Sequence, residues 1–222
     1  MEWKRAFEIA DAILPGETVL VEYTTSYLPE FFLKFFVEYS RERRIPLLID
    51  DDFDSLHTIL AHAKFLELEI DLDDVYVLKT GGRIELGNIV ARVPFHPDPR
   101  VYLRNYEEAS IKALERIPAP FINLVLGLET IFFPVRSPLE LYHILLSIQR
   151  FVGNRKRKAF YLINRAVMEN LPHNPLPELE RIATTLMVLK PYHTGADLSI
   201  KKAVNPVLNG MKTKVDAGRW SG

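Results

Sequence analysis

The sequence has no cysteine among its 222 residues. Disulfide bonds, thiolate metal sites and a cysteine nucleophile are therefore excluded. Glycine is scarce, with 10 residues, whereas roughly 7% is usual, so a glycine-rich loop that closes around phosphate groups is not expected. Glutamine occurs once, at Gln149. The shortage of glutamine and cysteine is typical of a heat-adapted source.

Long apolar runs are also missing. The most apolar window, Phe121–Phe133, has 13 residues and includes Asn123 and Glu129, whereas a membrane-spanning helix needs about 20. The first 14 residues carry several charges and lack the apolar stretch of a signal peptide. We therefore expect a cytoplasmic protein with no membrane span.

The composition is that of a folded domain, with 48% hydrophobic and 26% charged residues. Neither a repeat nor a long linker interrupts it, so residues 1–222 are interpreted as a single domain in which 191–222 form a C-terminal hairpin and tail. Charge is divided unevenly: residues 1–149 hold 15 basic and 24 acidic side chains, and residues 150–222 hold 13 and 5. This asymmetry fits a nucleic-acid surface, complementary surfaces within or between subunits, or simply solvated faces.

Apolar residues alternate between helical spacing and short continuous runs. Helices are expected between Trp3 and Leu14, from Pro29 to Arg44, from Asp54 or Ser55 to Leu66, from Pro99 to the residue before Pro118, from Pro138 to Gly153, and over Glu178–Thr184. Strands are expected at Thr18–Tyr23, Leu47–Asp50, Val75–Leu78, Phe121–Leu126, Ala159–Asn164 and Thr185–Leu189, with an extended, hairpin-like segment at Ile84–Val93. Alternating strands and helices predict an α/β fold, a three-layer sandwich with a mostly parallel central sheet.

Helix boundaries are marked by capping residues. Asp98 precedes Pro99, and Ser137 precedes Pro138 with Glu140 at the third helical position, which is a capping box. Asp54 is expected to cap the helix that follows it.

The order of these elements resembles the RecA/KaiC-like branch of the P-loop ATPases. Phe121–Gly127 looks like the Walker B strand, and Ala159–Asn164 like the strand that ends in a sensor residue. The resemblance runs from about Phe7 to Lys202 and implies a RecA-like core. The sequence is also similar to a family of uncharacterised proteins of heat-loving archaea, a domain of unknown function.

The phosphate-binding motif of that superfamily is not present. The segment Glu22–Pro29 stands where the Walker A motif GxxxxGK(S/T) would be. Glu22 and Tyr27 replace its glycines, Leu28 replaces the lysine that neutralises phosphate, and Pro29 replaces the magnesium-binding hydroxyl.

The Walker B carboxylate is missing as well. Gly127 occupies its position, with Glu129 two residues later. The resemblance therefore implies a RecA-like scaffold that has lost phosphoryl transfer and needs no cofactor, so we expect no enzymatic activity. An ordinary doubly wound domain with no relation to this superfamily is the alternative.

Polar residues follow the predicted strands, where open parallel sheets place their ligands. The candidate ligand-binding residues are Thr24, Thr25, Ser26, Asp50, Asp51, Asp52, Glu129 and Asn164. The carboxylates suit a hard cation such as magnesium, but they equally serve the N-terminus of the next helix. The hydroxyls equally cap the helix at Pro29.

Two further groups are interpreted as surface features. His57 and His62 lie five residues apart, which does not place them on one helix face. The basic turn Arg155–Lys158 precedes a strand and is interpreted as a solvated helix end, with contact to nucleic-acid phosphate as the alternative.

The function expected from these observations is that of a non-hydrolysing binding or regulatory module. Its degenerate P-loop region would hold a protein or peptide partner that carries a cationic group, and the chain would form an oligomer. A nucleic-acid-associated RecA paralogue is one alternative. A magnesium-dependent phosphohydrolase that uses the Asp50–Asp54 cluster, with Asp50 and Asp52 as a DxD pair, is another.

Overall fold

The computed structural model describes residues 4–24, 27–192 and 195–216. Helices are α1 (Lys4–Ala12), α2 (Leu28–Arg43), α3 (Ser55–Phe65), α4 (Pro99–Arg116), α5 (Pro138–Arg150), α6 (Arg165–Glu169), α7 (Leu176–Ile182) and the 3₁₀ helix η1 (Leu128–Phe132). Strands are β1 (Thr18–Tyr23), β2 (Leu47–Asp52), β3 (Tyr76–Thr80), β4 (Asn88–Val93), β5 (Phe121–Leu126), β6 (Arg157–Asn164), β7 (Thr185–Tyr192), β8 (Gly195–Lys202) and β9 (Lys212–Asp216).

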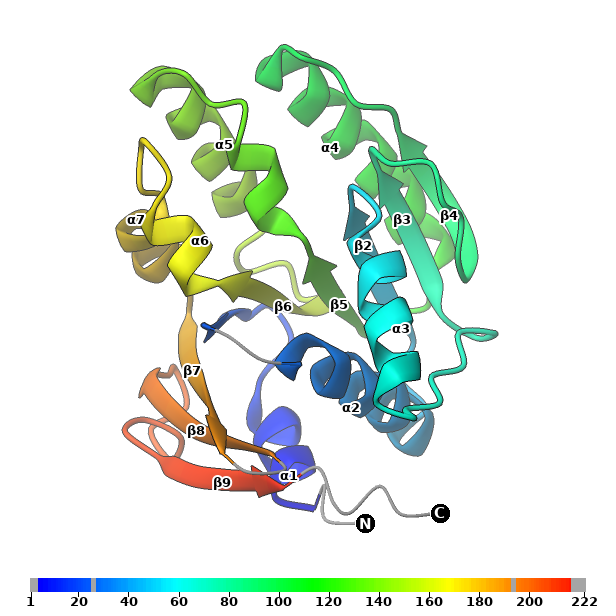
Figure 1. The fold of residues 1–222 in the computed structure, drawn as a ribbon, viewed down its shortest axis with the longest axis vertical. Helices are drawn as coiled ribbons and strands as arrows, with labels where there is room; N and C mark the ends of the chain where they lie inside the picture. The colour runs from blue at the N-terminus through cyan, green and yellow to red at the C-terminus, as the bar shows by residue number, and fades with distance from the viewer. Residues whose placement is uncertain (1–3, 25–26, 193–194, 217–222) are drawn as a thin grey trace.

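All nine of these strands form one sheet, in the order β4-β3-β2-β5-β6-β1-β7-β8-β9 (Figure 1). The pairs from β4 to β7 are parallel, and β8 and β9 are added as antiparallel strands. The predicted α/β fold with a mostly parallel sheet is therefore confirmed.

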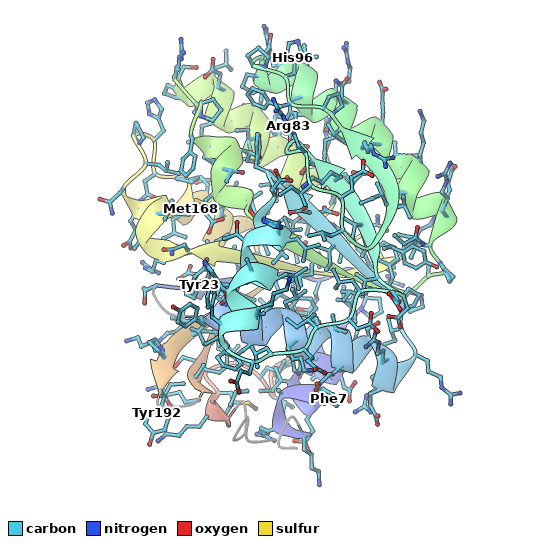
Figure 2. The ribbon with its side chains drawn as sticks, turned by 45° about the vertical axis from the view of Figure 1, so that its right-hand side comes forward. Phe7, Tyr23, Arg83, His96, Met168 and Tyr192 are labelled. Atoms are coloured by element: carbon cyan, nitrogen blue, oxygen red, sulfur yellow. The ribbon has the colours of Figure 1, made fainter. Side chains whose placement is uncertain are left out.

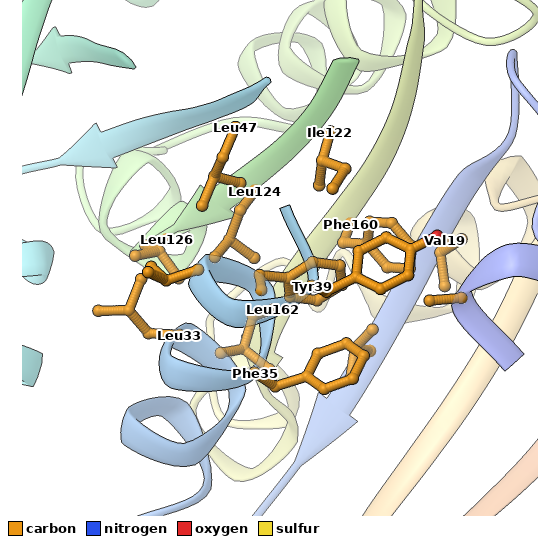
Figure 3. Close-up of a cluster of buried hydrophobic side chains, with 14 of the residues drawn as sticks. Val19, Leu33, Phe35, Tyr39, Leu47, Ile122, Leu124, Leu126, Phe160 and Leu162 are labelled. Atoms are coloured by element: carbon orange, nitrogen blue, oxygen red, sulfur yellow. The ribbon is translucent and has the colours of Figure 1, made fainter. Parts of the chain in front are cut away.

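Helices pack on both faces of the sheet. One face is covered by α1, α2 and α3, and its core is built around the aromatic stripe of α2 (Figure 3). Phe36 is central to this core, because its ring lies 4.5 Å from that of Phe160 on β6 and packs edge-on against Phe35. The other face is covered by α4, α5 and α7, with a separate set of apolar side chains. The parallel strands are thus buried on both sides, as their continuous apolar runs predict.

The prediction of a hairpin-like segment at Ile84–Val93 is wrong. Only Asn88–Val93 forms a strand, β4, and it runs parallel to β3. The connection holds this arrangement, because the carboxylate of Asp54 accepts hydrogen bonds from the backbone N–H groups of Arg83 and Ile84. Residues 81–87 are thereby drawn back along the sheet and cannot form a tight antiparallel turn.

The capping predictions have mixed outcomes. Asp98 accepts a hydrogen bond from the backbone of Arg100 at the start of α4, and Ser137 accepts one from Glu140 at the start of α5. Both helices therefore begin as predicted. Helix α5 ends at Arg150, three residues before the predicted Gly153.

The basic turn is not fully solvated as predicted. Arg157 and Lys158 belong to β6 and are buried. The Arg157 guanidinium donates to the side chains of Asn123 on β5 and Tyr161 on β6. The Lys158 ammonium donates to the carbonyl of Ala10. Two of the four charges are thus structural.

We expect Phe36→Ala to lower the free energy of unfolding by about 3–5 kcal/mol, because truncation leaves a cavity against Phe160. The matched control is Phe65→Ala, since the Phe65 side chain is 85% exposed, and its effect is expected to stay within about 0.5 kcal/mol. Urea unfolding of both variants measures the difference. Equal effects of the two substitutions would contradict the proposed position of the core.

Candidate functional site

The carboxyl ends of β2, β5, β6 and β1 lie side by side in the sheet. Carboxylates are concentrated there, and six of them, which we call the acidic edge, are buried: Glu22, Glu30, Asp50, Asp51, Asp52 and Glu129. Because each strand sends alternate side chains to opposite faces, these groups do not meet at one point. Several separate clusters result.

Glu129 and Asn164 come together as the sequence predicts. The backbone N–H of Asn164 donates to the Glu129 carboxylate, and the Asn164 side chain accepts from Val167 and so caps α6. Tyr23 is the last residue of β1 (Figure 2), and its hydroxyl interacts with Asn164 and Glu129. Burial raises the pKa of the Tyr23 hydroxyl, and the charges of Glu129 and Glu30 raise it further. These residues therefore form one polar cluster on the α2 and α3 side of the sheet.

Glu30 lies in the first turn of α2 and was not anticipated from the sequence. Its Oε1 lies 2.9 Å from Nδ1 of His62 on α3, while its Oε2 is buried without a hydrogen-bond partner. Burial raises the pKa of this carboxyl group, and the contact with His62 only partly offsets the increase. The Tyr27 ring packs edge-on against the His62 ring. His62 is exposed, as the prediction of a surface residue requires, and its ring is also tied to the buried Glu30 carboxylate.

Of the three predicted hydroxyl residues, Thr24 lies within the described part of the chain. Thr24 is exposed, and Thr25 and Ser26 lie outside the described residues. The residue that caps α2 is Tyr27, which makes no side-chain capping hydrogen bond. Thr24 therefore does not cap α2, contrary to the prediction that the hydroxyl residues cap this helix.

Glu22 points to the opposite face from Tyr23. Its Oε2 lies 2.6 Å from the Arg165 guanidinium, which also contacts Glu169 and Glu180, and its Oε1 has no partner. Burial raises the pKa of Glu22 to about 7 despite the attraction of Arg165. The Glu22 carboxylate near the end of β1 is therefore held inside the protein by a cation of α6.

The aspartates of β2 are divided between the two faces. Asp51 faces α3, where its Oδ2 lies 2.6 Å from the Lys79 ammonium and its Oδ1 accepts from the backbone of Leu56. Asp54, predicted as a side-chain cap of α3, has a left-handed backbone and makes no capping bond, because its carboxylate also binds Lys79. Asp51 replaces it at the helix N-terminus. Lys79 was missed, although a lysine within an apolar strand signals a buried partner.

Asp50 and Asp52 face α4 instead. The Tyr106 hydroxyl donates to Oδ2 of Asp50 at 2.6 Å, and the Thr80 hydroxyl donates to Asp52. Burial raises the pKa of Asp50 to about 6 and that of Asp52 well above its usual range, where nearby carboxylates add to the effect. Asp51 is thus separated from its neighbours by the sheet. Among the described residues, no three His, Asp or Glu side chains are placed to hold a metal ion together.

The comparisons with known proteins identify a family without assigning an activity. The chain belongs to the family described as Pyrococcus protein of unknown function, DUF257, whose model matches residues 8–214. This confirms the predicted similarity to an uncharacterised archaeal family. No curated protein matches the sequence.

Similarity to a solved structure supports the fold along the whole chain. A protein of Pyrococcus horikoshii OT3, determined in a structural study, is 26% identical, with a TM-score of 0.78 over 95% of this chain and 97% of that one. In the part of the chain that the structure describes, every helix is too short or too polar to cross a membrane.

We expect Lys79→Met to lower the free energy of unfolding by about 3–5 kcal/mol, because it leaves the buried Asp51 carboxylate without its cation. Lys64→Met is the matched control, since Lys64 lies exposed on α3, and it is expected to change stability by less than about 0.5 kcal/mol. Chemical denaturation tests both. A Lys79→Met protein as stable as the wild type would show that the Asp51 pair is dispensable.

The pH dependence of stability tests the environment of Glu22. Because burial raises its pKa from 4.5 to about 7 in the folded protein, the folded state favours the protonated form. The stabilisation is complete below about pH 4.5 and is lost as the pH rises to about 7.

We therefore expect the difference in unfolding free energy between wild type and Glu22→Gln to decrease across this range, by at most about 1.4 kcal/mol per pH unit. Glu115→Gln, which removes an exposed carboxylate, should reproduce the wild-type profile. A difference that stays constant with pH would mean that Glu22 keeps an ordinary pKa.

Proposed function

We propose that this protein is a RecA/KaiC-like scaffold that does not transfer phosphate and that binds a basic segment of a protein or peptide at its acidic edge. The observation that carries the proposal is the Glu30 carboxylate, which occupies the N-terminal turn of α2. In a P-loop protein the corresponding helix end holds the phosphates.

The order of the strands supports the RecA-like part of the proposal. β6, which resembles the sensor strand, lies between β1 and the Walker B-like strand β5. A sensor residue and a Walker B carboxylate must both reach one ligand, and this order places Asn164 and Glu129 in contact at the end of β1. The sheet therefore provides the layout of a nucleotide site, although its signature residues are absent.

The loop that would surround phosphate is too short, and acidic residues of the neighbouring strand and helix flank it. Glu22 and Tyr23 belong to β1, and Leu28 and Pro29 belong to α2, so four residues remain between strand and helix. Helix N-termini attract anions, but here Glu30 is already present, and a bound phosphate would lie close to its charge. We therefore infer that nucleotide phosphates are repelled.

A cationic partner fits the same features. Glu22 Oε1 and Glu30 Oε2 are carboxylate oxygens without a hydrogen-bond partner, so each can accept a further donor. Lysine carries a compact ammonium on a flexible four-carbon stem and can reach groups that lie below the surface. The basic residues 150–222 of a second copy are one source of such a segment, which would make the chain an oligomer.

The two other functions expected from the sequence receive less support. Arg157 and Lys158 are buried in β6, which leaves only half of the basic turn for contact with nucleic acid. Asp50 and Asp52, the proposed DxD pair, are engaged by hydroxyl groups of Tyr106 and Thr80 and lie apart from Asp51. Neither alternative is therefore preferred.

Calorimetric titration tests the proposal. ATP and ADP with magnesium are expected to give no binding heat at millimolar concentration. A lysine-rich peptide is expected to bind with an affinity that falls as salt increases, and the same peptide acetylated at every lysine should bind at least tenfold more weakly, which corresponds to about 1.4 kcal/mol.

Variants locate the binding site. Glu30→Gln and Glu129→Gln should each weaken peptide binding, whereas Glu115→Gln removes an exposed charge at the far end of α4 and should not. Micromolar binding of ATP would contradict the inference that nucleotide binding has been lost. Peptide binding that is unaffected by Glu30→Gln and Glu129→Gln would place the partner elsewhere.

A further inference from the structure

A small cavity lies on the α4 and α5 side of the sheet, away from Glu30 and its partner His62. Its volume is about 40 Å³, which is room for about three water-sized groups. The polar and aromatic part of its lining consists of Asp50, Asp52, Tyr102, Tyr106, Ser147, Phe151 and Tyr161. Such a combination of carboxylates and rings is unusual for an ordinary core.

Two atoms of this lining lack a hydrogen-bond partner. Oδ1 of Asp50 accepts no hydrogen bond, and the hydroxyl of Tyr102 is also unpaired. Both residues are more than nine-tenths buried, with 2% and 6% exposure. An unsatisfied buried polar atom is destabilising, so a bound molecule that donates hydrogen bonds to Asp50 would offset that cost.

Charge at the cavity is unbalanced. Asp50 and Asp52 line it, and Glu129 lies near enough to act on Asp52. The Arg157 guanidinium attracts the charge of Asp50 and so favours its ionised form. Arg157 itself donates hydrogen bonds to Asn123 and Tyr161. Lys79 is turned to the other face, toward Asp51. With its carboxylates ionised, the cavity therefore carries net negative charge.

We propose that this cavity binds a small monovalent cation that donates hydrogen bonds, ammonium or the head of a primary alkylamine. Such an ion donates to the free oxygen of Asp50 and to Asp52, and aromatic rings such as those of Tyr106 and Tyr161 attract cations through their faces. A divalent metal would need more oxygen ligands than the two carboxylates supply. This site uses Asp50 and Asp52 of the acidic edge but lies on the opposite face of the sheet from Glu30 and His62.

Solution NMR with ¹⁵N-labelled ammonium tests the proposal directly on the full-length protein at about pH 8, above the pKa of Asp50. A bound ion, protected from exchange, is expected to give a saturable ¹H–¹⁵N signal with nuclear Overhauser contacts to tyrosine ring protons. Methylammonium should compete for the site. Tetramethylammonium should not, because it is too large for the cavity and has no N–H donor.

Variants separate this site from general salt effects. Asp50→Asn and Asp52→Asn preserve side-chain size and should each abolish the bound signal, whereas Glu108→Gln, an exposed change on α4, should leave it intact. If an aspartate variant does not fold, the wild-type spectrum and the competition with methylammonium and tetramethylammonium still test the proposal. Absence of a protected ammonium signal in the wild type, or equal displacement by sodium and tetramethylammonium, would show that the cavity holds only water and overturn the proposal.

Discussion

Desolvation of carboxylates is the constraint on which the rest of this structure depends. The central sheet is covered on both faces, so the side chains at the carboxyl ends of its strands are removed from water. Burying an isolated charge is very costly, and each acidic side chain there has acquired a specific partner. Arg165 binds Glu22, Lys79 binds Asp51 and His62 binds Glu30. Hydroxyl or backbone groups bind Asp50, Asp52 and Glu129. These partners fix the positions of α6, of the loop after β3 and of α4.

The same constraint explains why the edge is suited to cations. The internal partners satisfy only some of the carboxylate oxygens, and those of Glu22, Glu30 and Asp50 that remain unpaired are buried. Their pKa values are raised because the charged forms lack hydration. A proton or a bound cation can balance such a group, and the two compete. Binding of a basic ligand is therefore expected to be coupled to proton release.

Local signals predicted the elements more successfully than the site. β1 and β5 have the predicted bounds because buried parallel strands are continuous apolar runs, and α4 and α5 start where Asp98 and Ser137 cap them. The period of two along β2 already separates Asp51 from Asp50 and Asp52, once the strand is known to extend to Asp52. The partners Lys79 and His62 are distant in sequence from Asp51 and Glu30, and tertiary packing alone brings them together. The parallel direction of β4 likewise depends on a distant contact, that of Asp54 with the backbone of Arg83.

Glu30 gives a physical reason why a fold of this kind can exist without a nucleotide. The N-terminus of a helix has unpaired N–H groups and a positive potential, which a bound phosphate satisfies in P-loop proteins. A carboxylate supplied by the third helical residue stabilises the same helix end, and here it is held by His62 of the neighbouring helix. In the function proposed above, a side chain of the protein thus replaces the ligand at this helix end. A scaffold stabilised in this way would not need ATP to order its edge, and that edge would be available for a partner of the opposite charge.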